Sequence, residues 1–303
     1  MNSLVITSLE QGLIFAVLAM GVFLTYKVLD IADLSVEGTF PMGAFVFAKF
    51  ISMGIDPIIS TLMAFCFGTL AGLLTATLYI KLKIQPLLAG ILTMTILYST
   101  NLRINGRANV PLFSYESVFN ISSTLVVLVV IVLLIKVLLD QFLKTEVGYL
   151  LIATGDNESL VRSLGASSNK YKLIGLMLAN GLVGLSGALM AQMQGFADIT
   201  MGHSIIVVAL ASVIIGDTIR KNSNKLKNTT RVIIGAIVYK IIGGIAIDLG
   251  LSPTDLKAIS AIIVIVFIAY NNFGVDLLGL KKPLKKVKEG KHRAKNIKSI
   301  EEF

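Results

Sequence analysis

Long apolar segments recur along the whole chain, and short polar segments separate them. A helix needs about 20 mostly apolar residues to cross the hydrocarbon core of a bilayer, whereas barrel strands show only alternating segments of about 10 residues. The segments fit the helical case. The pattern predicts an all-α, polytopic membrane protein with about nine transmembrane helices, at residues 8–28, 36–53, 58–80, 86–104, 121–139, 173–193, 203–219, 232–249 and 256–272.

Composition agrees with this pattern. Hydrophobic residues make up 55% of the 303 residues, charged residues make up 15%, and the mean hydropathy is +0.82. These values are far from those of a soluble globular domain. No Lys or Arg precedes Lys27, so the first apolar run lacks the basic region of a cleaved signal peptide and is expected to be a permanent helix.

Basic residues between the helices predict the orientation, because Lys and Arg are enriched in cytoplasmic loops. Residues 220–231 hold five basic and no acidic residues, and the chain from Lys281 onward holds nine basic and three acidic residues. Placing both in the cytoplasm also places the polar stretch 153–172 there. We therefore expect a multi-pass protein of the cell membrane, with an extracytoplasmic N-terminus and a cytoplasmic C-terminus.

The basic end of the chain predicts a division into two parts, a transmembrane domain of residues 1–275 and a cytoplasmic tail of residues 276–303. The tail supplies most of the net charge of +9. Its one aromatic residue is Phe303, and it follows a membrane helix directly. We therefore expect the tail to lie near anionic membrane lipid, and we expect no nucleic-acid partner.

Two polar segments interrupt the apolar pattern at the starts of predicted helices. They are LDIADLSVEGTFPMG at residues 29–43 and QMQGFADITMGHS at residues 192–204. Polar backbone at membrane depth is tolerated where it lines a cavity or packs against protein, and transporter sites are built from such broken helices. We therefore expect both segments to contribute to a translocation pathway.

The two segments also resemble each other, since both begin with Ala-Asp, at Ala32 and Ala197. The first follows a helix that runs inward and the second a helix that runs outward, so the two halves are predicted to form an inverted repeat. The two segments are then expected at opposite ends of the pathway, the first at the cytoplasmic end and the second at the external end. The alternative is that both are ordinary acidic starts of helices, where carboxylates are favourable.

Several other polar and small residues have structural interpretations. Gly68 and Gly72 form a G-x-x-x-G pair, and glycines recur every third residue from Gly181, so we expect close helix packing there. His203 has no Cys, Asp or Glu at metal-ligand spacing, so a structural hydrogen bond is favoured over a metal-ligand role. Lys240 lies inside the eighth predicted span and should face protein or water, or snorkel.

The stretch ATGDNESLVRSLGASSNKYK at residues 153–172 predicts a short cytoplasmic helix between two spans. Asp156 can cap its start, and Gly165 can end it. Leu160, Val161 and Leu164 are expected on one face. Acidic residues suit an anionic lipid surface poorly, so we expect this face to dock in a protein groove and not to rest on lipid.

The chain contains no H-E-x-x-H, G-x-S-x-G or G-x-x-x-x-G-K-[ST] motif. We therefore expect it not to be an enzyme. If ATP drives it, ATP and Mg must bind to a separate chain, and no cofactor is expected in this one.

Three stretches together resemble the permeases of ABC importers of the branched-chain amino acid and ribose class. Ala153, Gly155, Asn157 and Gly165 match the cytoplasmic coupling loop of that class, and DIADLSVEGTFPMGAFV is similar to its motif after the first helix. Residues 88–113 resemble a narrower subgroup of tryptophan, tyrosine or uncharacterised solute permeases. The resemblance covers roughly residues 8–275.

The resemblance implies an inverted-repeat ABC importer permease fold and the function of a membrane subunit that imports a small solute. An amino acid is expected, an aromatic one above all, with nucleosides and other heterocycles as rivals. It also implies three partners: an ABC ATPase, an extracytoplasmic solute-binding protein and a second copy of the permease. In this class the loop helix, at residues 153–168, docks into the ATPase. The residues to which this coupling role transfers are Gly155, Asp156, Asn157, Glu158, Arg162, Leu164 and Gly165.

One residue departs from the ribose-type motif, because Glu37 stands where that motif usually has Gly. Sugar permeases are therefore a poor guide to the solute. We expect a pathway lined by polar residues of both interrupted segments and by small or apolar residues between them. The expected residues are Ser35, Glu37, Thr39, Met94, Tyr98, Asn180, Asp198, Thr200 and His203. The alternative function is an ion-coupled secondary transporter, with Asp33, Glu37 and Asp198 as ion-binding groups.

Overall fold

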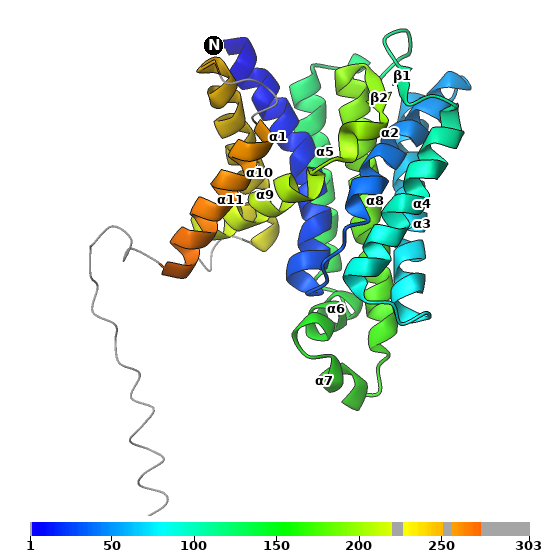
Figure 1. The fold of residues 1–303 in the computed structure, drawn as a ribbon, viewed down its shortest axis with the longest axis vertical. Coiled ribbons are helices and arrows are strands. Elements are labelled where there is room, and N and C mark those ends of the chain that lie inside the picture. The colour runs from blue at the N-terminus through cyan, green and yellow to red at the C-terminus, as the bar shows by residue number, and fades with distance from the viewer. Residues whose placement is uncertain (1, 220–226, 251–255, 274–303) are drawn as a thin grey trace, which may run out of the picture. The chain divides into compact units, whose positions relative to one another are not determined.

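The computed structural model describes residues 2–219, 227–250 and 256–273 (Figure 1). The predicted basic tail at 276–303 and most of the basic segment 220–231 lie outside the described residues. The described residues up to Phe267 form one compact unit. The helical elements are α1 (Asn2–Phe23), η1 (Leu24–Val28), α2 (Val36–Ser52), α3 (Pro57–Ile80), α4 (Pro86–Asn105), η2 (Val118–Asn120), α5 (Thr124–Phe142), α6 (Glu146–Asp156), α7 (Glu158–Ser163), α8 (Ser168–Gln194), η3 (Ile199–Gly202), α9 (Ile205–Ile219), α10 (Asn228–Asp248) and α11 (Leu256–Phe273).

Seven helical segments of the described chain are long and apolar enough to cross a membrane, and each coincides with a predicted span. They are Val5–Val28, Pro57–Ile80, Pro86–Asn105, Thr124–Phe142, Ser168–Gln194, Ile199–Thr218 and Asn228–Asp248. The predicted spans 36–53 and 256–272 form α2 and α11, of 17 and 18 residues. Nine crossings and the inverted repeat stay predictions.

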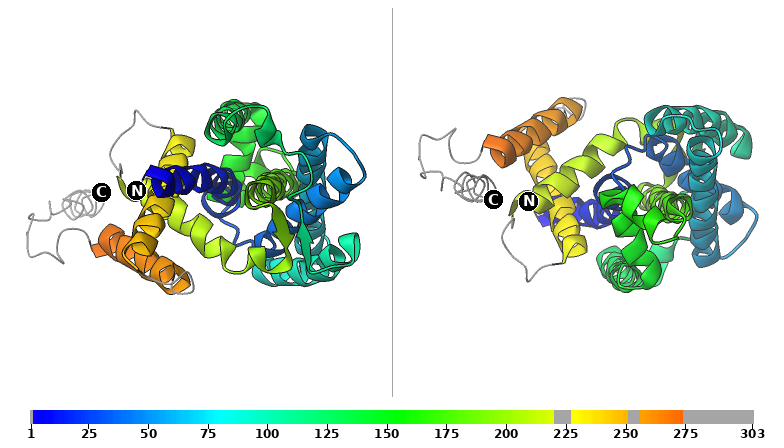
Figure 2. Two further views of the ribbon diagram at one scale, coloured as in Figure 1. Left: turned by 90° about the horizontal axis from the view of Figure 1, so that it is seen from above. Right: turned by 90° about the horizontal axis from the view of Figure 1, so that it is seen from below.

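Helix α8 lies between α1, α2 and α3 in the end-on views (Figure 2). Glycines allow backbones to touch there: a Cβ built on Gly68 of α3 would lie 2.5 Å from the carbonyl oxygen of Asn180, and one on Gly184 would lie 2.7 Å from that of Ala64. Real Cβ atoms cannot approach so closely. The predicted role of these glycines in close helix packing is confirmed.

The linker between α1 and α2 is irregular and mostly buried. Helix α1 ends in the π-helical turn η1, and π-helical turns are frequent at functional sites. Residues 29–35 follow, with Asp30 in the left-handed region at φ 54°. The N-cap of α2 is Ser35, which is completely buried. The linker is therefore irregular and mostly buried, with Asp30 and Ala32 exposed.

A short antiparallel ribbon joins the second interrupted segment to the loop after α4. Strand β1 (Asn109–Pro111) pairs with β2 (Phe196–Asp198), with Asn109 opposite Asp198. The all-α prediction did not include this ribbon, because three-residue strands leave almost no periodic signal. Figure 1 shows the ribbon at one end of the helix bundle and α6 and α7 at the other.

Candidate functional site

A fully buried polar network joins the α1–α2 linker to the middle of α8. The Asn180 side chain donates from Nδ2 to Asp33 Oδ2 at 2.8 Å, and its Oδ1 accepts from the Thr39 hydroxyl at 2.7 Å. The Ser35 hydroxyl lies 2.5 Å from Asp33 Oδ1, and the Ser35 backbone amide donates to the same oxygen at 2.9 Å. Several donors thus compensate the carboxylate for its removal from water.

Ser35, Thr39 and Asn180 are each 0% exposed, and none of them is among the residues that line the two cavities described below. Their predicted part in the pathway stays a prediction. Asp33, named for the ion-coupled alternative, is the carboxylate around which this network is built.

A cavity of about 320 Å³ lies where α2, α4 and η3 meet. The predicted pathway residues Glu37, Met94, Tyr98 and His203 all contribute to its wall. The remaining lining residues are Gly38, Pro41, Thr95, Ser99, Asn101, Ile199 and Gly202. Asn101 was not predicted, although Met94, Tyr98 and Asn101 follow the i, i+4, i+7 spacing of one helix face.

The expected placement of the two interrupted segments at opposite ends of a pathway was wrong. Glu37 and His203 line the same cavity, and a Cβ on Gly202 would collide with the backbone carbonyl of Glu37. The reason is that η3 turns back from the β-ribbon into the bundle and meets the first turn of α2. Ser204, at φ 62°, marks the turn into α9.

Asp198 and Thr200 are placed differently from His203, at the β-ribbon. Asp198 Oδ2 accepts from the Asn109 side chain at 2.9 Å, and its Oδ1 accepts from the Thr200 amide at 2.8 Å. Burial raises the pKa of the Asp198 carboxyl, but hydrogen bonds from Thr200 and Asn109 outweigh burial and hold that pKa below its usual value. Asp198 is thus an ionised anchor of the ribbon.

His203 makes the structural hydrogen bond that its sequence context predicted, with Nδ1 3.2 Å from the Thr200 carbonyl oxygen. Among the described residues no group of three or more His, Cys, Asp or Glu could hold a metal ion. Lys240 faces protein, as predicted: its ammonium lies 3.8 Å from the centre of the Phe15 ring and 3.4 Å from Gln11 Oε1.

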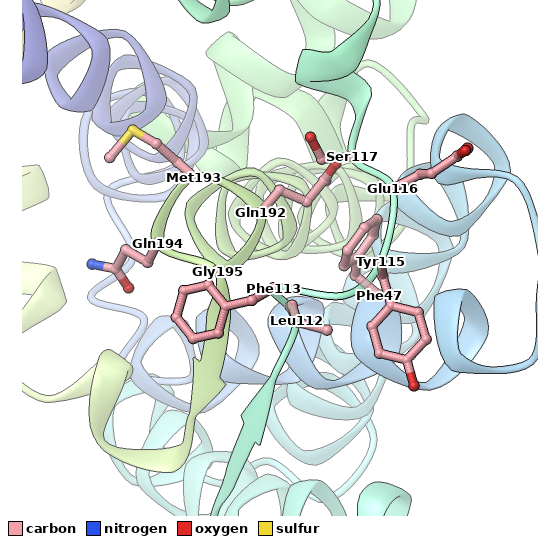
Figure 3. A pocket seen from close by; sticks show the side chains of 10 residues that line it. All are labelled: Phe47, Leu112, Phe113, Tyr115, Glu116, Ser117, Gln192, Met193, Gln194 and Gly195. Carbon is pink, nitrogen blue, oxygen red and sulfur yellow. The ribbon is translucent and has the colours of Figure 1, made fainter.

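A second cavity, of about 230 Å³, opens at the ribbon end of the molecule (Figure 3). Gln192 fixes its floor, because Oε1 accepts from the Val118 amide at 2.9 Å and Nε2 donates to the Thr61 hydroxyl at 3.0 Å. Phe113 lies beside Gly195 at its rim in Figure 3. Phe113 is 77% exposed and Tyr115 is 44% exposed, so this rim presents aromatic side chains outward.

The 153–172 stretch forms the end of α6, all of α7 and the start of α8, where one short helix was predicted between two spans. Asp156 is the last residue of α6 and does not cap α7. The cap is Asn157, whose side chain accepts from the Leu160 amide at 3.1 Å. Gly165 ends α7 as predicted, at φ 79°, with hydrogen bonds from Gly165 to the Arg162 carbonyl and from Ala166 to the Val161 carbonyl.

Glu158 ties α7 to the start of α8. Its carboxylate accepts from Lys172 Nζ at 2.7 Å and from the Ser168 hydroxyl at 2.9 Å, and it pairs with Arg162. The hydrogen bond from Lys172 is the largest influence and lowers the pKa of Glu158 to about 2, against an opposing effect of burial. Lys172 also donates to the Tyr79 hydroxyl at 3.0 Å, which joins α3 to the same cluster. No local pattern in the chain predicts this long-range contact.

The expected apolar face of the loop helix divides into two. Val161 is 0% exposed and packs into the protein, whereas Leu160 is 51% and Leu164 is 67% exposed. Gly155 lies against the backbone of Val28 and Leu29, so it serves close packing of α6. The loop is thus anchored from one side and presents leucines on the other.

Comparison with known proteins places these features in a family. Residues 4–269 match the family described as the permease component of branched-chain amino acid transport systems. The chain is 46% identical to a tyrosine transport system permease protein of Clostridioides difficile over 274 residues, which are 90% of this chain and 93% of that one. It is 35% identical to the uncharacterized protein RP368 of Rickettsia prowazekii, over 87% of this chain and 96% of that one.

A solved structure, described as PsaBC from Streptococcus pneumoniae in complex with Fab, has a similar fold. The TM-score is 0.52 and the identity 16%, with 89% of this chain and 94% of that chain covered. The similarity concerns the fold alone.

Proposed function

The chain belongs to the family of branched-chain amino acid transport permeases, and from that premise we propose that it is the membrane subunit of an ATP-driven importer of an aromatic amino acid. The observation that carries the proposal is the 46% identity to a tyrosine transport permease over nine-tenths of both chains. Nucleosides and related heterocycles are the competing solutes. The chain itself carries no catalytic step, and ATP and Mg bind to a partner ATPase.

The exposed leucines of the coupling loop are the proposed contact with that ATPase. Leu160 and Leu164 project from a loop that Glu158 and Lys172 clamp to α8. A clamped loop moves as one body with α8, so a push from the ATPase reaches the middle of the membrane domain. Asp156, Arg162 and Gly165 surround this contact and shape the docked surface.

The cavity at α2, α4 and η3 is the proposed part of the translocation pathway. Thr95, Tyr98 and Ser99 of α4 are exposed beside it, and the carboxylate of Glu37 lies in its wall. A carboxylate that faces lipid is costly, so water or protein must cover this surface. A second copy of the permease is the proposed cover, which makes the functional unit a homodimer around a central route.

The aromatic rim of the second cavity, beside the β-ribbon, is the proposed docking face for an extracytoplasmic solute-binding protein. Phe113 and Tyr115 are exposed there, and aromatic side chains are enriched at protein interfaces. The proposal sets the N-terminus outside and the C-terminus in the cytoplasm of the cell that makes the protein.

An ion-coupled secondary transporter is the second candidate, because carboxylates line the interrupted segments. Two of the three candidate groups have full sets of hydrogen-bond donors: Asp33 is held by Asn180 and Ser35, and Asp198 by Asn109 and Thr200. Their structural roles favour the ATP-driven proposal over the ion-coupled one.

Co-purification tests the proposal. The tagged chain, extracted in mild detergent from the cells that make it, is expected to bring down a second copy of itself and an ATPase chain with a phosphate-binding loop. The same extraction with Leu164→Asp should lose the ATPase, whereas Leu82→Asp, at another exposed cytoplasmic leucine, should keep it. A wild-type chain that purifies without any nucleotide-binding partner would contradict the proposal.

A further inference from the structure

The cavity between α2, α4 and η3 presents hydrogen-bond acceptors on one part of its wall. Glu37 contributes a carboxylate, and Asn101 is a lining residue whose side-chain oxygen is buried. No Lys or Arg belongs to the lining among the described residues. Glu37 also accepts a hydrogen bond from the Ser204 backbone amide, and it lies near His203, the lining residue that can carry a positive charge. With His203 neutral, the wall carries the negative charge of Glu37 and can accept further hydrogen bonds.

Asn101 is the second, independent sign of a ligand. Its side chain is 0% exposed, and Nδ2 donates to the Gly38 carbonyl at 3.2 Å. Its Oδ1 is buried without a partner in the part of the chain that the structure describes. A reversed amide would set Oδ1 against the Gly38 carbonyl, so the contact fixes the orientation. Buried acceptors nearly always have a donor, and a ligand whose donor group enters the cavity deeply enough to reach Oδ1 can supply it.

The remaining wall is mostly apolar. Met94, Tyr98, Pro41 and Ile199 supply aliphatic and aromatic surface, to which a hydrocarbon or aromatic ring can pack. His203 Nδ1 lies beside the Thr200 carbonyl, so that nitrogen carries a proton, and in the neutral ring Nε2 is a further acceptor. A volume of about 320 Å³ lies at the lower end of the range for small-molecule sites.

We propose that this cavity is a binding site for the protonated amino group of the transported solute, with Glu37 as its counter-ion, Asn101 as a second acceptor and Met94 and Tyr98 as the surface for an apolar or aromatic side chain. An ammonium carries three donors and a positive charge, which suits two acceptors of which one is anionic. The site holds one end of the solute only, so binding is weak enough for release, as transport requires. That the solute is a transported one rests on the proposed function, whereas the binding site itself is inferred from the cavity.

The test is protection of a thiol in the purified permease without ATPase, ATP or binding protein. The chain is made as Ser99→Cys in a Cys66→Ala background and placed in lipid nanodiscs. Ser99 lines the cavity, and Cys66 is the single cysteine of the chain, so the new thiol is the one that reacts. The rate of alkylation by N-ethylmaleimide is measured with phenethylamine, with tyrosine and with 3-phenylpropionate, which has the ring and no amine. Phenethylamine and tyrosine are expected to slow alkylation, and 3-phenylpropionate is not.

Glu37→Gln in the same background should raise the phenethylamine concentration that gives half-protection about tenfold or more, because it removes the charged acceptor. Glu146→Gln, at an exposed glutamate of α6, is the matched control and should leave protection unchanged. Asn101→Leu, which keeps a similar volume, is the second variant and should weaken protection as well. Equal protection by the amine and the acid, no protection by the amine, or full protection in Glu37→Gln would each overturn the proposal. Because no ATP is present, these outcomes are independent of whether import is ATP-driven.

Discussion

The side-chain amide of Asn180, near the middle of α8, donates a 2.8 Å hydrogen bond to the carboxylate of Asp33 in the irregular linker between α1 and α2. Asn180 also accepts from Thr39 in the first turn of α2. One buried side chain therefore fixes both the linker and the start of the helix that carries Glu37. The position of the cavity wall depends on this contact.

Asn180→Leu is expected to lower the free energy of unfolding by about 3–5 kcal/mol, because it leaves a buried carboxylate without a main partner. The measurement is the thermal unfolding of the purified protein in detergent. Asp33→Asn combined with Asn180→Leu should be less destabilised than Asn180→Leu alone, since the charge is gone. A double variant that is destabilised by the sum of both single changes would show that the two side chains are not coupled.

Changes in the loop at residues 153–168, the proposed coupling loop, should impair transport without unfolding the protein. Leu164→Asp and Gly165→Val should leave the protein in the membrane but separate ATP hydrolysis from transport, the first through loss of an apolar contact and the second through strain at φ 79°. Both rates are measured on the reconstituted complex. Leu82→Asp is the control at an exposed leucine outside the loop, on the side that is proposed to be cytoplasmic. Normal transport by Leu164→Asp would show that this contact is not used.

The clamp of Glu158 should make the stability of the loop depend on pH. Its folded pKa is about 2, lowered from an ordinary 4.5, so its stabilising effect is present above pH 4.5 and is lost as pH falls from there toward 2. Glu158→Gln should lower stability by about 1 kcal/mol or less at neutral pH, since the group is partly solvated. The difference in unfolding midpoint between wild type and Glu158→Gln should shrink between pH 5 and pH 3. For Glu146→Gln it should stay small throughout, and a Glu158→Gln difference that grows toward low pH would refute the clamp.

Helix packing by glycine gives a prediction with a matched control inside the chain. Gly68→Val should destabilise the protein by about 2 kcal/mol or more, because the new side chain meets the backbone of Asn180 and Gly181. Gly243→Val, in α10, has no atom within 4 Å of its new Cβ in the described chain and should cost much less. The measurement is the yield and the thermal midpoint of each variant in detergent. Equal stability of the two would contradict the close contact of α3 and α8.

The helices could be predicted from the sequence because their signal is local. Pro57 and Pro86 stand at the first turns of α3 and α4, and the apolar runs behind them are long enough to set the spans. Gly165 was predictable for the same reason, since a helix that ends in the left-handed region favours glycine. Asp156 and Asn157 are equally good caps by type, and only the backbone between α6 and α7 decides that Asn157 acts.

The site could be predicted only in part, because it is built by contacts between distant segments. Four lining residues were predicted to belong to the pathway: Glu37, Met94, Tyr98 and His203. They meet in one cavity because η3 returns into the helix bundle, which no local pattern in the sequence shows. Val161 was expected on the docking face with Leu160 and Leu164, because the sequence does not show which side of a six-residue helix packs on its own chain. Asn101 was missed because one amide within an apolar helix gives no local sign of an unpaired oxygen.

ATP dependence of uptake is the most direct measurement of the central claim. The permease, its co-purified ATPase and its binding protein are reconstituted in proteoliposomes, and entry of labelled tyrosine is followed with ATP on the ATPase side or with an imposed sodium or proton gradient. The expected result is uptake with ATP, none with either gradient alone and none when the ATPase is omitted. Uptake by the permease alone in response to an ion gradient would contradict the account and identify a secondary transporter.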